Sequence, residues 1–360
     1  MKKDWTYKKL GEVAEIKAGF TPSSSELHEA GEYPYYKVSD MNTTGNEVFL
    51  ISTLSYVKQS KKYFPKGSIA FPKNGAAIAT NKKRILKYDS IVDLNTGVCI
   101  FDSDILPKFG YYWFQNIDFR NYTRGGALPT LDIKTISLKK IPIPPLSIQH
   151  SMVAELDLLH SVISKKKEQL RELDNLALSL FYEMFGDPII NSMGWEIKKF
   201  AELFKLKSGD GLSAKMFENG PYPVYGGNGI SGQHCSYNMD GNYIIIGRVG
   251  VYCGNVRNVV GKFWLTDNAF QLFYDEDNNN PIFVTKLLTY LNLNQYANQA
   301  AQPVISNITL KDILVPLPPL SLQQSFAAKV SAIEAQKQAV QQSIREIEAL
   351  LAERMDNYFG

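Results

Sequence analysis

Two stretches of the chain carry apolar residues at alternating spacings of four and three, one starting at Met152 and the other at Phe326. This spacing places the apolar side chains in a narrow stripe along one side of a helix, and a stripe sustained over about five heptads is typical of a coiled coil. The pattern predicts two long helices, residues 146–186 and 320–360, that pair with each other. The predicted seam consists of Met152, Leu156, Leu159, Ile163, Leu170 and Leu173 in the first helix and of Phe326, Val330, Ile333, Ile344, Ile347 and Leu351 in the second.

An ordinary amphipathic helix packed on its own domain is the alternative, although such a helix needs a wider apolar stripe and rarely reaches about 40 residues. Lys166 and Lys337 interrupt the seam. Either these lysines fix the register of the pair, or their ammonium groups extend to solvent.

A proline motif precedes each predicted helix. Residues 141–151 read "IPIPPLSIQHS" and residues 315–325 read "VPLPPLSLQQS". Because proline cannot lie inside a helix, Ser147 and Ser321 are the predicted N-caps, and Ser321 with Gln324 forms the Ser-x-x-Gln pattern of a capping box.

The match extends far beyond the prolines. At a shift of 174 residues, "GALPTLDIKTISLKKI" aligns with "AAQPVISNITLKDILV", and at a shift of 190 Trp5 meets Trp195. Such a match indicates a duplicated unit rather than a duplicated linker. The first helix leaves one copy and enters the other, so antiparallel pairing would return the second helix to the first copy. We therefore expect an antiparallel coiled coil and a circular, pseudo-two-fold arrangement.

The regions outside the helices, residues 1–145 and 187–319, are patterned mostly as strands. Short β-branched or aromatic runs such as "GSIAFPKNGAAIATNKKRILKY", "GVCIFDSD", "NYIIIGRVGVYCGNVRNVVG" and "FQLFYDED" are separated by Gly, Asn and Asp. Two helical patches, "FGYYWFQNI" and "PIFVTKLLTYLNLNQYANQ", accompany them. Each region is therefore predicted to be α+β.

Composition sets the broad class. A chain of 360 residues with 44% hydrophobic and 21% charged residues is globular and long enough for about two domains. It has no run of 18 uncharged apolar residues, so we expect a cytoplasmic protein. Its three cysteines are scattered, which fits a reducing compartment and predicts neither a disulfide framework nor a zinc site.

Charge is unevenly distributed. Residues 1–145 hold 21 Lys and Arg against 14 Asp and Glu, whereas residues 187–319 hold 10 against 11. Positive clusters in the first region suit phosphate contact, although single lysines on a solvated surface are an equally simple reading. At a shift near 175, "AFPKNG" aligns with "IIGRVG", which pairs Lys73 with Arg248. Equivalent basic residues on equivalent loops favour a shared role.

Searches for catalytic motifs find none. The glycine-rich "YGGNGISG" lacks the Gly-Lys-Ser/Thr ending of a P-loop, and no Asp-Pro-Pro-Tyr or Asn-Pro-Pro-Tyr tetrapeptide is present. Asp187 with Glu196 and Lys198 superficially resembles a nuclease site, but the aligned positions 6–8 carry no acid. The four histidines lack metal-ligand spacing. The sequence predicts no catalytic residue and no metal.

Two divergent α+β regions, each followed by Pro-x-Pro-Pro-Leu-Ser-x-Gln and a long helix ending in Phe-Gly, resemble the specificity subunit of type I restriction-modification systems. "IIIGRVG" and "LKKIPIPP" also look like this family, and the resemblance covers the whole chain. It implies two target recognition domains, residues 1–145 and 187–319, each reading one half of a split, asymmetric DNA site. The helices at residues 146–186 and 320–360 would set the separation of the half-sites.

The resemblance also implies the partners. These are double-stranded DNA, two methyltransferase subunits that carry S-adenosylmethionine and modify adenine, and motor-nuclease subunits that use ATP and Mg²⁺. This chain itself is expected to be non-catalytic and to hold no cofactor.

The side chains best suited to base edges are Arg, Lys, Asn and Gln on the ends of strands. The candidate DNA-binding residues are Lys73, Asn74, Lys82, Lys83, Arg84 and Arg124 in the first region and Arg248, Arg257, Lys262, Gln299 and Gln302 in the second. Because the second region is slightly acidic, we expect the isolated chain to bind DNA poorly and its partners to supply much of the phosphate contact.

Two alternatives remain open. A coiled-coil scaffold that does not read DNA would explain the helices but not two divergent caps, and a stand-alone DNA-modifying enzyme would require the catalytic residues that the searches do not find. A fragment ending at Gly186 would keep one reader and one helix, and we expect it to dimerise and read a palindromic site.

Overall fold

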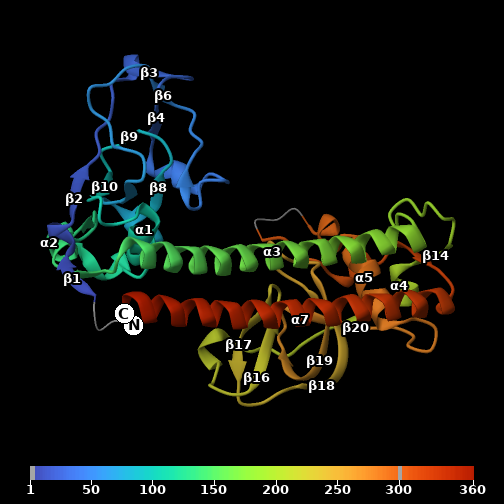
Figure 1. Cartoon of the computed structure of the whole chain (residues 1–360). Coiled ribbons are helices and arrows are strands. Elements are labelled where there is room, and N and C mark those ends of the chain that lie inside the picture. The colour runs from blue at the N-terminus through green and yellow to red at the C-terminus, as the bar shows by residue number, and fades with distance from the viewer. Residues whose placement is uncertain (1–4, 299–301) are drawn as a thin grey trace. The chain divides into compact units, whose positions relative to one another are not determined.

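The structure is a computed structural model that describes residues 5–298 and 302–360. The chain forms two compact units (Figure 1). Unit 1 contains residues 5–165 and 343–360, and unit 2 contains residues 166–298 and 302–342. Each unit therefore combines one α+β region with parts of both long helices, and the division between units falls inside the helices rather than at their ends.

Unit 1 is built on short strands. A five-stranded sheet has the order β2-β10-β7-β8-β5, and a four-stranded sheet has the order β3-β6-β4-β9. The strands of the first are β2 (Ala14–Ala18), β5 (Phe49–Leu50), β7 (Ile69–Pro72), β8 (Arg84–Leu86) and β10 (Thr96–Phe101). Those of the second are β3 (Leu27–His28), β4 (Tyr33–Tyr36), β6 (Tyr56–Val57) and β9 (Ile91–Val92). The two remaining pairs are β1 (Thr6–Lys9) with β13 (Lys140–Ile143) and β11 (Thr123–Arg124) with β12 (Thr130–Leu131).

Helix α1 (Pro107–Gln115) fills the core of unit 1, and α2 (Ile133–Ser137) precedes β13. Proline at the start of α1 suits the first turn, where the amide hydrogen has no helical partner. Five of its residues between Phe109 and Phe114 are buried aromatic residues. The sixth, Gly110, lets the helix approach β10 closely, because a Cβ there would lie 2.2 Å from the Phe101 ring. The pattern predicted this helix correctly.

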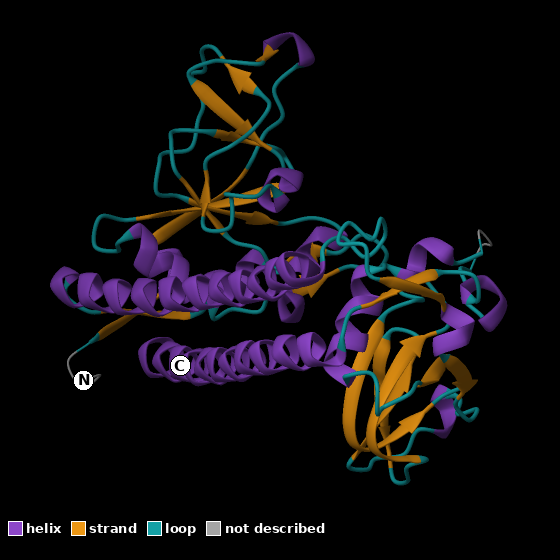
Figure 2. Ribbon diagram, turned by 90° about the vertical axis from the view of Figure 1, so that its right-hand side faces the viewer, coloured by secondary structure: helices purple, strands orange, loops and turns teal. Residues whose placement is uncertain are grey.

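Unit 2 contains a six-stranded sheet with the order β15-β20-β18-β19-β16-β17, whose strands are drawn in orange in Figure 2. These strands are β15 (Lys205–Ser208), β16 (Tyr222–Gly226), β17 (Gly229–His234), β18 (Met239–Gly247), β19 (Val256–Leu265) and β20 (Ala269–Phe273). The pair β14 (Glu196–Lys199) with β21 (Leu314–Leu317) and the helices α4 (Phe200–Leu203), α5 (Pro281–Tyr290) and α6 (Asn307–Leu310) complete the unit. The predicted helical patch thus ends early, at Tyr290, where Asn292 takes a left-handed conformation with φ 49°.

The duplication seen in the sequence is a duplication of structure. Thr6 pairs with Ile143 in β1 and β13, and Glu196 pairs with Leu317 at the equivalent positions of β14 and β21. Each unit also buries an equivalent ring pair: Phe109 packs against Phe359, and Phe283 packs against Phe185. The recurring Phe-Gly at the ends of the long helices therefore reflects a repeated core contact.

The long helices are α3 (Leu146–Phe185) and α7 (Leu320–Phe359), each of 40 residues. In unit 2 Asp174 of α3 pairs with Lys337 of α7, and Phe181 further along α3 contacts Phe326 nearer the start of α7. Within this unit the two helices α3 and α7 therefore run antiparallel, as the connectivity predicted. In unit 1 Glu155 of α3 pairs with Arg354 of α7.

All twelve predicted seam residues are buried or half-buried. Met152 and Leu156 belong to the core of unit 1, and Phe326 and Val330 belong to the core of unit 2. The helix ends thus pack against the globular cores as well as against each other. The coiled-coil prediction describes the contacts between the two helices, and the amphipathic-helix alternative describes the contacts of the helix ends with the globular cores.

Both N-cap predictions are wrong by two positions. Helix α3 begins at Leu146, and the Pro145 carbonyl accepts hydrogen bonds from the amides of Ile148 and Gln149. The Pro319 carbonyl does the same at the start of α7. Proline therefore occupies the N-cap, because its fixed φ suits this position, and Ser147 and Ser321 lie in the first helical turn.

Candidate nucleic-acid interface

The loop after β7 carries Lys73 and is held on both sides by backbone hydrogen bonds. Lys73 N donates to Asn95 O over 2.8 Å, and Lys73 O accepts from Leu131 N over 2.9 Å. Gly75 N donates to Pro129 O over 2.7 Å. We call Lys73–Gly75 the basic loop of unit 1. Its position is fixed by the backbone rather than by the lysine side chain.

The loop after β18 is held in the same way around Arg248. Arg248 N donates to Asn268 O over 2.9 Å, Arg248 O accepts from Ile305 N over 3.0 Å, and Gly250 N donates to Pro303 O over 2.9 Å. We call Arg248–Gly250 the basic loop of unit 2. Three matched hydrogen bonds make the two loops equivalent, so the alignment of Lys73 with Arg248 reflects structure.

Three of the candidate residues in unit 1 lie close together. Asn74 forms an isolated bridge with Thr130, and Arg124 pairs with the same threonine across β11 and β12. Lys73 is adjacent to Asn74. The Arg124 side chain is 62% exposed, and its guanidinium pairs with Asp132 over 2.6 Å. A hydrogen bond from Thr135, assisted by Arg124, lowers the pKa of the Asp132 carboxyl.

Lys83 is buried, which corrects its prediction as a DNA contact. Its side chain is 0% exposed, and Nζ donates to Asn81 Oδ1 over 2.6 Å and to Ile117 O over 2.7 Å. The ammonium also lies 4.2 Å from the centre of the Phe119 ring. Burial lowers the pKa of Lys83 to about 7. This lysine supports the fold of unit 1.

Lys82 and Arg84 flank Lys83 in the sequence. Lys82 is half-buried and donates to Oδ1 of the exposed Asn42. Arg84 is half-buried and donates to the carbonyls of Lys83 and Met41, and burial lowers the pKa of its guanidinium. Arg84 therefore joins two segments of unit 1, and its contact with DNA stays a prediction.

In unit 2 the predicted DNA-binding residues lie in different places. Arg248 stacks over the Phe270 ring at 5.4 Å and reaches Ser208 Oγ at 3.3 Å. Gln302 is exposed beside Pro303, which bonds the basic loop. Lys262 lies elsewhere, 4.7 Å from the Tyr237 ring centre and paired with Asp240. Gln299 lies outside the described residues.

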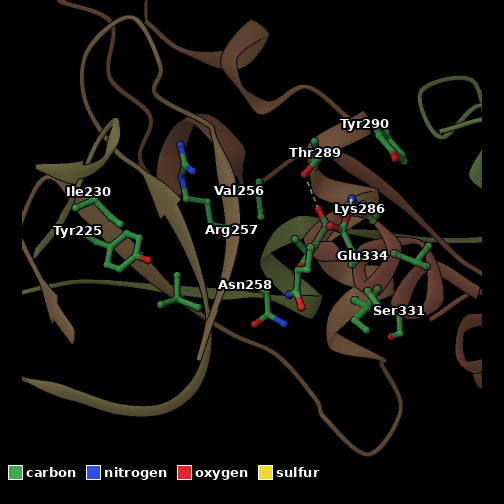
Figure 3. Close-up of a pocket in the computed structure, with 16 residues that line it drawn as sticks. Tyr225, Ile230, Val256, Arg257, Asn258, Lys286, Thr289, Tyr290, Ser331 and Glu334 are labelled. Atoms are coloured by element: carbon green, nitrogen blue, oxygen red, sulfur yellow. Dashed lines mark hydrogen bonds and ion pairs between the residues drawn. The ribbon is translucent and has the colours of Figure 1, made fainter. Parts of the chain in front are cut away.

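Arg257 lines a cleft of about 820 Å³ within unit 2 (Figure 3). Tyr225 and Ile230 lie on its strand side, and Lys286 of α5 and Glu334 of α7 lie on its helix side. Lys286 Nζ is 3.3 Å from Glu334 Oε1. The Arg257 guanidinium lies against the turn between β16 and β17, where Nη2 donates to Asn228 O over 3.4 Å, so its partners differ from those of Arg248.

Sequence reasoning missed the exposed apolar tips of these loops. Leu128, between β11 and β12, is 81% exposed, and Val251, beside the basic loop of unit 2, is 77% exposed. Gly126, two residues before Leu128, and Gly250, directly before Val251, were the available signal, because glycine is frequent in tight surface loops. Apolar side chains of this kind can insert between stacked bases.

It also missed the two glutamines of the repeated motif. Gln149 Nε2 donates to Pro144 O and Asp104 O, and Gln149 Oε1 accepts from Leu106 N at the start of α1. Gln323 likewise joins Pro318 O to Asn280 N at the start of α5. The sequence signal for this role was that both copies of the proline motif carry glutamine at the same position. These buried amides tie each long helix to the α+β region that it supports.

No helix within residues 5–298 and 302–360 is long and apolar enough to cross a membrane. The described residues contain one group with mixed metal-ligand chemistry, formed by Glu218, His234 and Cys235. The spacing of cysteines and histidines along the chain gave no indication of it, because the acid comes from a distant segment.

Two α+β units with equivalent basic loops, each tied to a long helix, define a protein built from a duplicated unit. The sequence profile for the type I restriction modification DNA specificity domain matches residues 2–175 and 193–349. The chain belongs to this family.

Named relatives agree. The chain is 26% identical over 348 residues to the Escherichia coli "Type I restriction enzyme EcoprrI specificity subunit", a match that covers 89% of this chain and 85% of that protein. It is 28% identical over 260 residues to the MjaIX specificity subunit of Methanocaldococcus jannaschii, covering 61% of this chain and 57% of that protein.

Solved structures show the same fold. The S subunit of the type I restriction-modification system from M. genitalium matches with a TM-score of 0.59 at 17% identity, covering 99% of this chain and 96% of that one. A chain from a study of assembly and conformational transition of the type I R-M system matches with a TM-score of 0.61 at 18% identity, covering 99% and 97%.

Proposed function

We propose that this chain is the DNA-reading subunit of a type I restriction-modification complex and that each unit reads one half of a bipartite, asymmetric site. The observation that carries the proposal is the equivalence of the two basic loops, held by matched hydrogen bonds on two units whose remaining loops differ. Equivalent placement with different side chains suits two readers of different sequences.

In unit 1 the reading surface comprises Lys73, Asn74 and Arg124, with Lys82 nearby and Leu128 as an apolar tip. In unit 2 it comprises Arg248 and Gln302 with Val251, and Lys262 contacts phosphate from a separate position. Arg and Lys suit guanine edges and phosphates, and Asn and Gln suit adenine. Arg257, which lines the cleft, contributes less than Arg248.

The chemistry belongs to the partners in this proposal. Methyltransferase subunits carry S-adenosylmethionine and modify adenine, and motor-nuclease subunits use ATP and Mg²⁺, all in the cytoplasm. The long helices offer them exposed leucines: Leu158 is 63% exposed and Leu176 is 52% exposed. Exposed apolar side chains on a charged helix suit a protein interface.

The scaffold alternative predicts no dependence of methylation on the loops. The test is single-molecule methylation mapping of host DNA after co-expression of this chain with its neighbouring candidate methyltransferase gene. We expect N6-methyladenine in a two-part motif with a fixed spacer, absent when this chain is omitted. Methylation without the chain, or none despite a stable complex, would favour the scaffold.

Loop variants assign the half-sites. Lys73→Ala should lower methylation or relax sequence preference at one half-site, and Arg248→Ala at the other, by about tenfold, because a good base contact contributes about 1–3 kcal/mol of discrimination. Lys8→Ala and Lys198→Ala, exposed residues at equivalent positions of β1 and β14, are the matched controls, because neither strand forms a basic loop. Equal loss at both half-sites from each single variant would contradict the assignment.

A further inference from the structure

A mixed cluster of metal-ligand side chains lies in unit 2, away from the basic loop. Glu218 precedes β16, His234 ends β17 and Cys235 follows it. One ligand atom from each residue lies within 4.8 Å of the others. The Cys235 thiol donates to Glu218 Oε2 over 2.6 Å, so two of the three groups already touch.

The imidazole of the cluster is buried, and one of its nitrogen atoms makes no hydrogen bond. His234 is 8% exposed, and its Nδ1 atom has no hydrogen-bond partner among the described residues. The ring packs against Trp264 with 5.3 Å between centroids. Because a buried nitrogen without a partner costs free energy, a metal ion bound at Nδ1 would remove this cost.

The backbone brings the acid to the other two ligands. A Cβ at Gly220 would lie 2.3 Å from His234 O and 2.5 Å from the Cys235 Cα. Only glycine permits this approach. The segment that carries Glu218 therefore lies directly on the end of β17, and the cluster is a product of close packing.

The donor set selects the class of metal. Calcium and magnesium prefer oxygen ligands, whereas thiolate and imidazole suit zinc. Zinc is bound by four ligands, so three protein groups leave one position for water at this partly exposed site. Zinc binds the deprotonated thiolate, so a bound cation would replace the proton that Cys235 donates to Glu218.

We propose that Glu218, His234 and Cys235 form a zinc site that fastens the segment before β16 to the end of β17. Strand β17 is at the edge of the six-stranded sheet and pairs with another strand on one side only, so the metal would give it a second attachment. The loop that follows carries Tyr237, which contacts Lys262. Zinc would thereby also fix the surroundings of this basic residue.

The test uses the purified full-length chain, stripped with a chelator and then titrated with Zn²⁺ or Co²⁺. We expect one metal ion per folded chain and, with Co²⁺, an absorption band from thiolate-to-metal charge transfer. Cys235→Ser should abolish the band and weaken zinc binding by at least about tenfold. Glu218→Gln should weaken zinc binding and keep the band.

Cys253→Ala is the matched control, because Cys253 is a buried thiol of the same unit that lies outside the cluster. It should keep both metal content and absorption band. Failure of the folded wild-type chain to take up stoichiometric metal would overturn the proposal, as would an unchanged band in Cys235→Ser. Neither outcome bears on DNA reading, because no methylation is measured.

Discussion

Some basic residues of this protein support the fold, although their charge suggested a DNA contact. Lys83 and Arg84 sit in a run of basic residues yet turn inward, whereas Lys73 and Arg248 are placed by their backbones at equivalent loops. Packing explains the difference, because Lys83 donates to Ile117 O and Arg84 donates to Met41 O, and both carbonyls belong to other segments of unit 1. A basic cluster in sequence is thus not one surface patch.

Lys83 gives a prediction about pH. Burial lowers its pKa to about 7, whereas an unfolded lysine titrates near about 10.4. Between these values the unfolded chain binds more protons, so the free energy of unfolding should rise with pH by at most about 1.4 kcal/mol per unit. Urea denaturation at several pH values should show a smaller rise in Lys83→Met than in the wild type. Lys58→Met, at an exposed position, should match the wild type; an unchanged slope in Lys83→Met would contradict the prediction.

The motif glutamines give a second prediction. Gln323→Ala leaves the buried Asn280 amide and Pro318 carbonyl without their partner, so unit 2 should lose about 2–4 kcal/mol of unfolding free energy. The adjacent Gln324 is exposed on the same helix turn, and Gln324→Ala should change stability by less than about 0.5 kcal/mol. Denaturation of the two variants side by side is the measurement. Similar stabilities would show that the amide is dispensable.

At the scale of elements, Lys337, one of the two lysines that interrupt the seam, has a carboxylate partner on the facing helix and another on its own helix. Lys337 Nζ lies 2.6 Å from Asp174 Oδ1 and 3.1 Å from Glu334 Oε2. Burial alone would lower the pKa of Lys337, but the two carboxylates outweigh it and raise the pKa. This contact favours the reading in which Lys337 fixes register, at least in unit 2.

A double-mutant cycle tests this contact. Lys337→Met and Asp174→Asn should each destabilise unit 2, and the double variant should lose less than their sum, by about 0.5–1 kcal/mol, because Asp174 is largely exposed and water screens the pair. Lys329→Met, at an exposed position of α7, should show no coupling to Asp174→Asn. Strict additivity in the first cycle would exclude a specific contact.

At the scale of the whole molecule, the core of each unit includes the last turns of a long helix, and in unit 1 these turns come from the far end of the sequence. The last turns of α7 supply Leu351, Met355 and Phe359 to the core of unit 1. The last turns of α3 supply Phe181 and Phe185 to unit 2. A fragment ending at Gly186 would therefore leave the core of unit 1 uncovered, which is a physical reason for the dimerisation predicted from sequence.

The two terminal phenylalanines should act on different units. Phe185→Ala should destabilise unit 2 by about 3–4 kcal/mol, and Phe359→Ala, at a half-buried site, should destabilise unit 1 by about 1–2 kcal/mol. Hydrogen exchange should show lost protection in α5 for the first variant and in α1 for the second. Glu183→Ala and Asn357→Ala are exposed controls on the same turns. Loss of protection in both units from either change would show that they unfold together.

Periodicity and repetition determined much of this protein by themselves. The spacing of apolar residues predicted two long helices, and the repeat predicted two equivalent α+β regions and the pairing of Lys73 with Arg248, because duplicated sequence preserves duplicated contacts. Only the tertiary structure decided which basic side chains face outward, that the motif glutamines bridge helix starts, and that Glu218 meets His234 and Cys235. These depend on close packing of segments far apart in the chain, and local patterns carry no information about such distances.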